Sequence, residues 1–394
     1  MILALALGFA QAATQDPGTL EKAIRLMNPV SKTSSSFLLD LFASPRDNPK
    51  LSPKGFGDPP KQGVFPWLVK GFGLSGGYAV ERTRVYCQQQ ADENTAIAVG
   101  RMQMRLWEYL SNTLGMDHPD DFYHGVLFTY LCQGGKPGGE EIAGNDLQVD
   151  GDRVETFAVN EQGMPLARRA VGGGGEIGKA LTVYIYDIGT FSKPMEMARE
   201  VAHEYGHAAL PGVGGYSEPE YWANGYLGEK LFLKHAAEAM TRGDLIPDDV
   251  MGVTLPQIKS WLKTNVDPLV EDAAVHGPFD PRLRDTSTVG MGYYIGLALY
   301  MDTVLPEKVF SRSMQVMGSI DAKDYPDAIV LAATEPAKYT LRVPAYLSGK
   351  TIWFPLASSK LFGAAVLKKK GDWALIRPGT GPVTVVPRHD PGQS

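Results

Sequence analysis

Cysteine is scarce in this sequence, because only Cys87 and Cys132 occur among 394 residues. Two cysteines exclude a disulfide-dense scaffold and a zinc site built from thiolates. Both fall in runs with strand character, at 78–88 and 126–133. They would form one bridge if the protein is exported and the two strands are neighbours, and two buried free thiols are the alternative.

A strong excess of either charge is also missing. The formal net charge is −6, with 21% charged and 44% hydrophobic residues. This balance gives no electrostatic reason to expect nucleic acid or an anionic membrane as a partner. The composition is typical of a soluble globular protein, and 394 residues are enough for two or three domains.

Long hydrophobic runs are absent, which argues against stable membrane insertion. The apolar segment at residues 1–15 is too short to span a bilayer and ends in the small-x-small pattern Ala10-Gln11-Ala12. This pattern resembles a secretory signal peptide cleaved after Ala12 or Ala13. We therefore expect a signal peptide at residues 1–13 and a secreted or periplasmic protein. A truncated start or a short buried helix is the alternative.

Histidine is rare too, with seven residues, but two of them stand in His203-Glu204-Tyr205-Gly206-His207. The surrounding run, 194–210, has the composition of a helix, so residues four apart lie on one face. The pattern is H-E-x-x-H, in which the two imidazoles bind Zn²⁺ and the carboxylate takes a proton from the metal-bound water. We expect His203 and His207 as metal ligands and Glu204 as general base. The alternative is a pair of surface histidines on an ordinary amphipathic helix.

The flanking residues support this interpretation. Residues 181–186 are β-branched and aromatic, which favours a strand before the helix. Ser192 and Pro194 are typical of a helix start, and Pro211-Gly212 of a helix end. A strand that leads through a short turn into a metal-binding helix resembles the zincin metallopeptidase pattern.

A catalytic zinc ion needs a third protein ligand, and the segment 216–229 offers Glu218, Glu220 and Glu229. Trp222-Ala-Asn-Gly-Tyr-Leu-Gly-Glu229 resembles the Trp-x-Asn-Glu-Gly segment of gluzincin metallopeptidases, with Gly225 where aminopeptidase-like members carry Glu. The resemblance implies that a Glu on the helix after H-E-x-x-H completes the site. We favour Glu220, because Asn224 lies one helical turn later, where thermolysin-like members carry an acid that hydrogen-bonds a metal-ligating His. The resemblance implies that the Asn224 carbonyl accepts that ring N–H. The metzincin pattern does not fit, since Leu210 and Val213 occupy its Gly and third-His positions.

A further resemblance concerns the group that would stabilise the oxyanion. Tyr293-x-x-Gly296 is similar to the Tyr-x-x-Gly segment that supplies this tyrosine in aminopeptidase-like gluzincins, although Ile295 replaces the usual lysine. The resemblance implies that Tyr293 donates a hydrogen bond to the developing charge. Tyr294 in this role, or a packing role for both rings, remains open.

The pattern along the chain predicts an α+β fold with a zincin-like mixed sheet, a helical subdomain and a small β-rich segment. The expected parts are a signal peptide (1–13), a lead-in (14–75), the zincin domain with the H-E-x-x-H helix (76–215), a helical subdomain (216–337) and the β-rich segment (338–394). In the lead-in we expect a short apolar helix at 36–42. In the zincin domain we expect one strand at 76–86, a helix at 92–114, a strand at 126–132 and a hairpin around Asp150-Gly151. In the helical subdomain we expect helices at 220–240, 256–267 and 292–302.

One glycine-rich stretch and one strand bear on the expected function. Gly172–Gly175 lacks the Gly-Lys-Ser/Thr ending of a phosphate loop and precedes a strand, so a flexible loop is the better interpretation. The strand 182–186 is expected at the edge of the sheet, where an extended peptide could pair with it.

Taken together, these residues predict a zinc metallopeptidase acting on polypeptides by metal-activated water. Two other classes stay open: a binding protein on a zincin fold that has lost turnover, and a zinc hydrolase of a non-peptide amide or ester. Cleavage preference and oligomeric state do not follow from the sequence.

Overall fold

A computed structural model describes residues 39–42, 76–80, 83–87, 92–115, 127–131, 138–150, 153–159, 165–167, 176–217 and 220–387. The expected signal peptide and Gly172–Gly175 lie outside the described residues. The chain divides into two compact units. Unit 1 comprises Met1–Trp107, His118–Ala208 and Glu238–Leu255, and unit 2 comprises Glu108–Asp117, Ala209–Ala237 and Pro256–Ser394.

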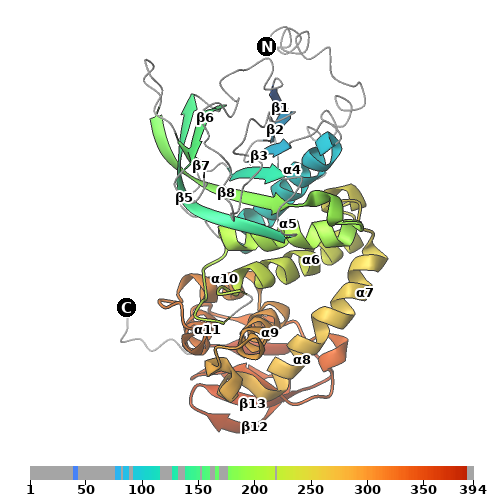
Figure 1. Ribbon diagram of the computed structural model, residues 1–394. Coiled ribbons are helices and arrows are strands. Elements are labelled where there is room, and N and C mark those ends of the chain that lie inside the picture. Colours follow the sequence, from blue (N-terminus) through green and yellow to red (C-terminus); the bar gives the residue numbers. More distant parts are fainter. Residues whose placement is uncertain are drawn as a thin grey trace. The chain divides into compact units, whose positions relative to one another are not determined.

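Unit 1 contains an eight-stranded mixed sheet with the strand order β1-β2-β3-β4-β8-β5-β6-β7 (Figure 1). Its strands are β1 (Leu39–Phe42), β2 (Gly76–Val80), β3 (Thr83–Cys87), β4 (Leu127–Leu131), β5 (Gly138–Asp150), β6 (Arg153–Val159), β7 (Pro165–Ala167) and β8 (Glu176–Tyr186). Strands β3, β4 and β8 are parallel, and α4 (Glu93–Glu108) connects β3 to β4 as parallel pairing requires. The helix expected at 92–114 is thus confirmed, and its last part, Tyr109–Leu114, is a π-helix.

The position of β8 corrects one expectation. Strand β8 pairs with β4 on one side and with β5 on the other, so it is an internal strand. The expectation that 182–186 is an edge strand open to a peptide is therefore wrong. The reason is that β5 and β6 form the predicted hairpin, and β5 is long enough to fold back along β8. Strand β6 pairs with β5 at Gln148–Asp150.

Two other local expectations in unit 1 are wrong. Residues 36–42 were expected to form a helix, but Leu39–Phe42 is a strand paired with β2, because a short apolar run does not distinguish the two states. Residues 76–86 were expected to form one strand, but β2 and β3 are an antiparallel pair. The interruption at Glu81-Arg82 contains no Gly, Asn or Pro and so carries no turn signal. Cys87 lies on β3 next to β4, and Cys132 lies outside the described residues.

The helix predicted at 194–210 is present as α5 (Pro194–Ala209). Its first turn is held by Glu196, whose carboxylate accepts the Lys193 backbone N–H at 3.2 Å and the Ser192 hydroxyl at 3.4 Å. The capping acceptor is therefore Glu196 and not Ser192. One face of the helix is fully buried, which fixes its rotation; this face includes Met197, Ala198, Val201, Ala202, Tyr205 and Ala208.

A buried carboxylate joins two distant parts of unit 1. Asp249, in the 3₁₀ turn η5 (Pro247–Val250), has no exposed surface and accepts from Arg101 Nε at 2.8 Å and Arg105 Nε at 3.0 Å. It also accepts the Ile246 backbone N–H at 2.9 Å. Two guanidinium groups and a backbone donor satisfy this charge, as burial requires.

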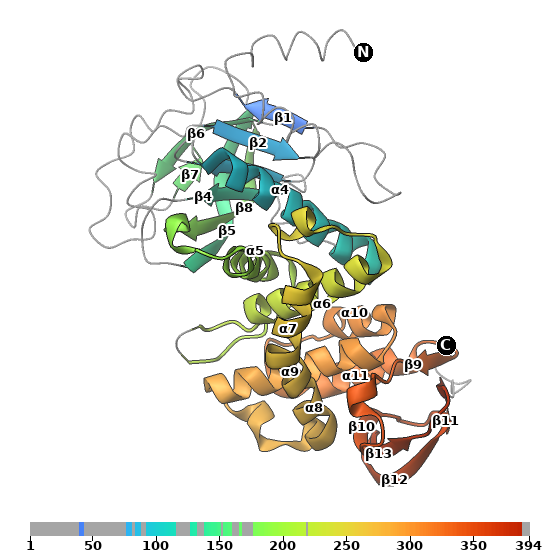
Figure 2. The same cartoon turned by 90° about the vertical axis from the view of Figure 1, so that its right-hand side faces the viewer.

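Unit 2 is built around α9, which is buried along almost its whole length among α8, α10 and α11 (Figure 2). The helices that lie wholly or mainly in this unit are α6 (Asn224–Arg242), α7 (Leu255–Asn265), α8 (Asp267–His276), α9 (Thr288–Val304), α10 (Glu307–Gln315) and α11 (Tyr325–Thr334). The expected helix at 256–267 corresponds to α7, and α8, α10 and α11 were not expected. Each of these three has no more than ten residues, too few for a clear periodic pattern.

The C-terminal part of unit 2 is β-rich, as expected. One small sheet has the order β10-β13-β12 and the other β11-β14-β9. Their strands are β9 (Tyr339–Leu341), β10 (Ile352–Pro355), β11 (Lys360–Phe362), β12 (Ala364–Lys370), β13 (Trp373–Pro378) and β14 (Val383–Val386). The protein is therefore α+β. Across the described ranges, none of the helices is long and apolar enough to cross a membrane.

Candidate metal centre

The two histidines of the motif face each other on α5. Their Nε2 atoms are 3.1 Å apart and their rings meet at 71° with centroids 4.8 Å apart. Two nitrogens bound tetrahedrally at 2.0–2.1 Å from one zinc ion would be about 3.3 Å apart. Both side chains are partly exposed, so a metal ion can reach them. The spacing of four residues thus produces the ligand pair that the sequence predicts.

Glu220 is the carboxylate that gathers with this pair. One ligand atom from each of His203, His207 and Glu220 lies within 4.8 Å of the other two. Two ligand atoms on a single zinc ion can be at most about 4.4 Å apart, so small side-chain adjustments would bring all three onto one ion. These two nitrogens and one carboxylate oxygen suit zinc and also other divalent transition metals.

The other acids considered as third ligand are placed differently. Glu229 is on α6, only 1% exposed, with a carboxylate oxygen 4.0 Å from Lys230 Nζ, and it is not part of the cluster. Glu218 lies outside the described residues. The expected helix at 220–240 begins only at Asn224, so Glu220 belongs to the loop before α6 and not to the helix.

Glu204 is buried to 3% exposure against strand β5. A Cβ atom on Gly139 would lie 2.5 Å from Glu204 Cγ, Cδ and Oε1, which is too close for any side chain at that position. Glu200, one turn earlier, approaches the neighbouring Gly138, whose Cβ would lie 3.9 Å from its Oε1. Gly139 therefore lets the Glu204 carboxylate lie directly on the strand backbone.

Asn224 ties the two ends of the loop that carries Glu220. Its Nδ2 donates to the carbonyl oxygen of Leu210 at 3.3 Å, and the side chain is buried. Leu210 follows directly on α5, so this bond satisfies a carbonyl at the helix end. The expected hydrogen bond from the ring N–H of a ligating histidine to the Asn224 carbonyl stays a prediction.

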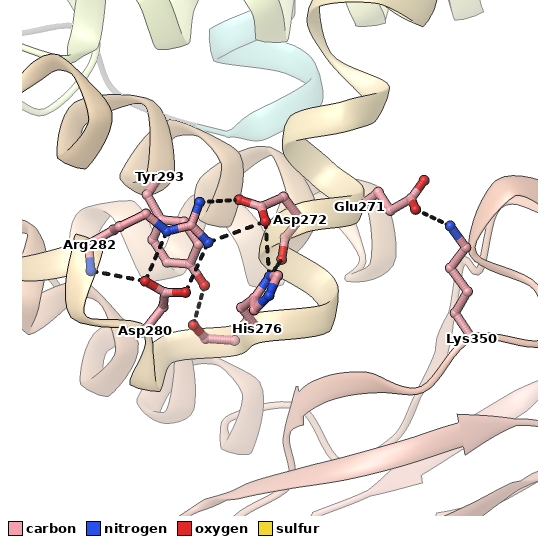
Figure 3. A network of polar contacts seen from close by, with 8 residues as sticks. Glu271, Asp272, His276, Asp280, Arg282, Tyr293 and Lys350 are labelled. Atoms are coloured by element: carbon pink, nitrogen blue, oxygen red, sulfur yellow. Dashed lines mark hydrogen bonds and ion pairs between the residues drawn. The ribbon is translucent and has the colours of Figure 1, made fainter.

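Tyr293 belongs to a polar network in unit 2 (Figure 3). Its hydroxyl donates to the Gly277 carbonyl at 2.5 Å, and the Arg282 guanidinium lies 4.3 Å from its ring centroid. Burial raises the pKa of Tyr293, and the Asp280 charge raises it further, so the phenol stays neutral. This geometry gives Tyr293 a structural role, and its role as oxyanion donor remains a prediction.

The network around Tyr293 is held by charge. Arg282 contacts Asp272 at 2.7 and 3.2 Å and Asp280 at 2.9 Å through both Nε and Nη2. The hydrogen bonds from Arg282 lower the pKa of Asp280, and those to both acids raise the pKa of Arg282. His276 adds a contact of 2.9 Å to Asp272.

The glycine of the Tyr-x-x-Gly segment has a packing reason of its own. A Cβ on Gly296 would lie 2.8 Å from the Leu269 carbonyl oxygen, because α8 and α9 pack closely there. Tyr294 is fully buried and stacks edge-on with Tyr325 at 5.4 Å. The Tyr294 hydroxyl has no hydrogen-bond partner among the described residues. The alternative expectation, that Tyr294 and not Tyr293 is the oxyanion donor, therefore stays open.

Sequence reasoning missed Gly139, which carries no motif of its own. Residues 134–139 are glycine-rich, a composition that favours a loop, but β5 begins at Gly138. Glycine usually weakens the interior of a strand. The close approach of Glu204 explains why a glycine stands at position 139.

Comparison with known proteins adds no family assignment. The chain matches no protein-family model, and a search of curated proteins finds no significantly similar sequence.

Proposed function

We propose that the protein is a zinc-dependent metallopeptidase with a zincin-like unit 1. One observation carries the proposal: the His203 and His207 Nε2 atoms, 3.1 Å apart, gather with the Glu220 carboxylate. The neighbouring Glu204, buried against β5, adds a fixed base. This set of residues matches what metal-assisted hydrolysis needs.

Each side chain has a role that follows from its position. His203 and His207 would hold the ion through Nε2, and Glu220 through a carboxylate oxygen. When bound, zinc supplies a nucleophile near neutral pH and polarises the substrate carbonyl. Glu204 accepts the proton released by the nucleophile and delivers it to the leaving amine. Its place against the Gly139 backbone keeps the carboxylate in one orientation throughout.

The scissile bond would lie beside Glu204. Because Gly139 of β5 touches this carboxylate, the backbone at Gly139 would border the substrate next to the base. The strand 182–186 is internal and is not available to pair with a peptide.

The test combines metal analysis with digestion of a peptide library. Purified protein should contain about one zinc per chain, cleave library peptides, lose activity with a chelator and regain it on addition of Zn²⁺. Zinc without cleavage of any peptide would contradict the peptidase and point to a binding protein. Cleavage confined to model esters or simple amides would indicate a different hydrolase.

A further inference from the structure

Three exposed apolar residues contact Gly214 in unit 2, two through their rings and one through its backbone carbonyl. Tyr221 is 52% exposed, Trp222 38% and Ile320 49%. A Cβ on Gly214 would lie 2.6 Å from the Trp222 ring and 2.9 Å from Tyr221 Cε1, and the Gly214 backbone N–H donates to the Ile320 carbonyl at 3.0 Å. We call Tyr221, Trp222 and Ile320 the Gly214 patch.

The loop that carries Tyr221 and Trp222 is held in place. The described parts of the chain between α5 and α6 lie side by side (Figure 2). Ala223 N–H donates to the Val213 carbonyl at 2.8 Å and Tyr216 N–H to the Tyr221 carbonyl at 3.3 Å. Ser217 N–H donates to the Thr286 carbonyl at 2.8 Å, which fastens the hairpin to the rest of unit 2.

The two aromatic rings are packed against each other as well as exposed. They meet edge-on at 72° with centroids 5.0 Å apart, and Trp222 also covers Gly212, whose Cβ would lie 3.1 Å from the ring. Two aromatic rings that stay exposed on an ordered loop, with the exposed Ile320 joined to that loop through its backbone, are costly in water, and such surfaces mark binding sites. Rigid aromatic rings lose little entropy when they bind, so the patch is prepared for a ligand.

The chemistry of the surroundings indicates a neutral apolar ligand. Asp321, which follows Ile320, is paired with Lys323 at 2.6 Å, so the two charges compensate each other. The exposed residues of the patch itself are aromatic and aliphatic. Such a surface favours apolar side chains, with binding that grows with the apolar area removed from water.

The patch adjoins the proposed ligand Glu220 in the chain. Tyr221 is the next residue, and consecutive Cα atoms are about 3.8 Å apart. An extended peptide rises about 3.3–3.6 Å per residue, so a residue one or two positions from the scissile bond would come within reach of Tyr221. Resting on the metallopeptidase function proposed above, we infer that the Gly214 patch binds an apolar side chain of the polypeptide substrate near the cleaved bond.

The test uses zinc-loaded full-length protein and peptides that differ only in the residue next to the cleaved bond: Ala, Leu or Phe. The wild type should prefer Leu and Phe. Tyr221→Ala should lower kcat/KM for the Leu and Phe peptides about tenfold, the size of effect typical of apolar pocket contacts, and leave the Ala peptide unchanged. Ile320→Ser, from a separate segment, should shift the preference in the same direction.

The matched control is Phe362→Ala, because Phe362 is an equally exposed aromatic residue (56%) on β11. It should change none of the three rates. Equal losses on all peptides, or no loss with either patch variant, would overturn the inference. A change from dimer to monomer in Tyr221→Ala, measured by light scattering, would assign the patch to contact between copies and would also overturn it.

A binding arm separates this inference from the peptidase proposal. Fluorescence anisotropy with the labelled Leu and Ala peptides reports binding even if no bond is cleaved. Tyr221-dependent binding without hydrolysis would support the patch and refute the peptidase. If Tyr221→Ala still hydrolyses the peptides with an unchanged preference, the peptidase proposal is supported and the patch inference is refuted. If the wild type shows no binding and no hydrolysis, both are refuted.

Discussion

Helix α5 keeps its histidines partly exposed and its glutamate against a strand backbone, whereas α9 is buried along almost its whole length. Both helices carry segments that resemble metallopeptidase motifs. On α5 the polar atoms face one another and remain able to bind a metal. On α9 the tyrosine hydroxyl is bonded to a backbone carbonyl, and the glycine is required by helix packing. The same kind of sequence resemblance can therefore reflect chemistry in one helix and packing in another.

The largest effect is expected from Glu204→Gln on α5. The variant should keep zinc but lose about 10²–10⁴-fold in kcat, because the amide cannot accept the proton. Peptide hydrolysis and zinc content measured on the same samples check this. Glu196→Gln, on the same helix, should retain full activity, since an amide can still cap the first turn. A fully active Glu204→Gln would refute the assigned base.

Gly139→Ala tests whether the place of Glu204 on β5 matters. The added Cβ would overlap the carboxylate, and a displacement of about 1 Å can cost on the order of 10²-fold in rate. The matched control is Gly189→Ala, where a Cβ meets nothing within 4 Å. Zinc content should stay the same in both variants. Wild-type kcat in Gly139→Ala would show that the base tolerates movement.

Glu220→Gln compares the two acids considered as third ligand. Zinc affinity should fall by more than the ~10–100-fold lost when an outer partner of a ligand is replaced. Competition with a chromophoric chelator measures it. Glu229→Gln should leave zinc affinity unchanged, because Glu229 is outside the cluster. The reverse result would assign the third ligand to Glu229.

On α9 two glycines one turn apart should respond in opposite directions. Gly296→Ala would push the new Cβ to 2.8 Å from the Leu269 carbonyl and lower the free energy of unfolding by about 1–3 kcal/mol. At Gly292 a Cβ meets nothing within 4 Å, so Gly292→Ala should raise it by about 0.5–1 kcal/mol through helix propensity. Urea denaturation tests both. Equal effects would mean that α8 and α9 are not in such close contact.

The smallest effect is expected from Tyr293→Phe. Loss of the hydrogen bond to Gly277 should lower the free energy of unfolding by about 1 kcal/mol and leave kcat unchanged. An oxyanion donor would behave differently, with kcat reduced roughly 10²–10³-fold at unchanged stability. Stability and kcat measured together decide between the two roles. The second result would mean that the Tyr-x-x-Gly segment of α9 serves catalysis and not only packing.

The parts of the site that follow from local geometry were predictable. The facing histidines result from a four-residue spacing on one helix, and Pro and Gly marked the ends of that helix. Glu220 was favoured by spacing, but its place in the loop before α6 was not predicted. The internal position of β8 depends on which strands pair across the sheet, and hydrophobic patterning does not specify the pairing order. The role of Gly139 was not predictable, because it depends on a contact with Glu204 from a distant part of the chain.

The hydrogen bonds that Arg101 and Arg105 of α4 donate to Asp249 have a consequence for biosynthesis. Asp249 lies 148 residues after Arg101 in the chain, and residues 209–237, which belong to unit 2, come between. During synthesis the sheet, α4 and α5 emerge before the carboxylate that pairs with this charge cluster. Domains usually fold from the N-terminus as they leave the ribosome, but unit 1 must wait for a late segment. A fragment cut after residue 215 would lack that carboxylate and leave two arginines of the interior without it, so unit 1 is not separable at that point in the chain.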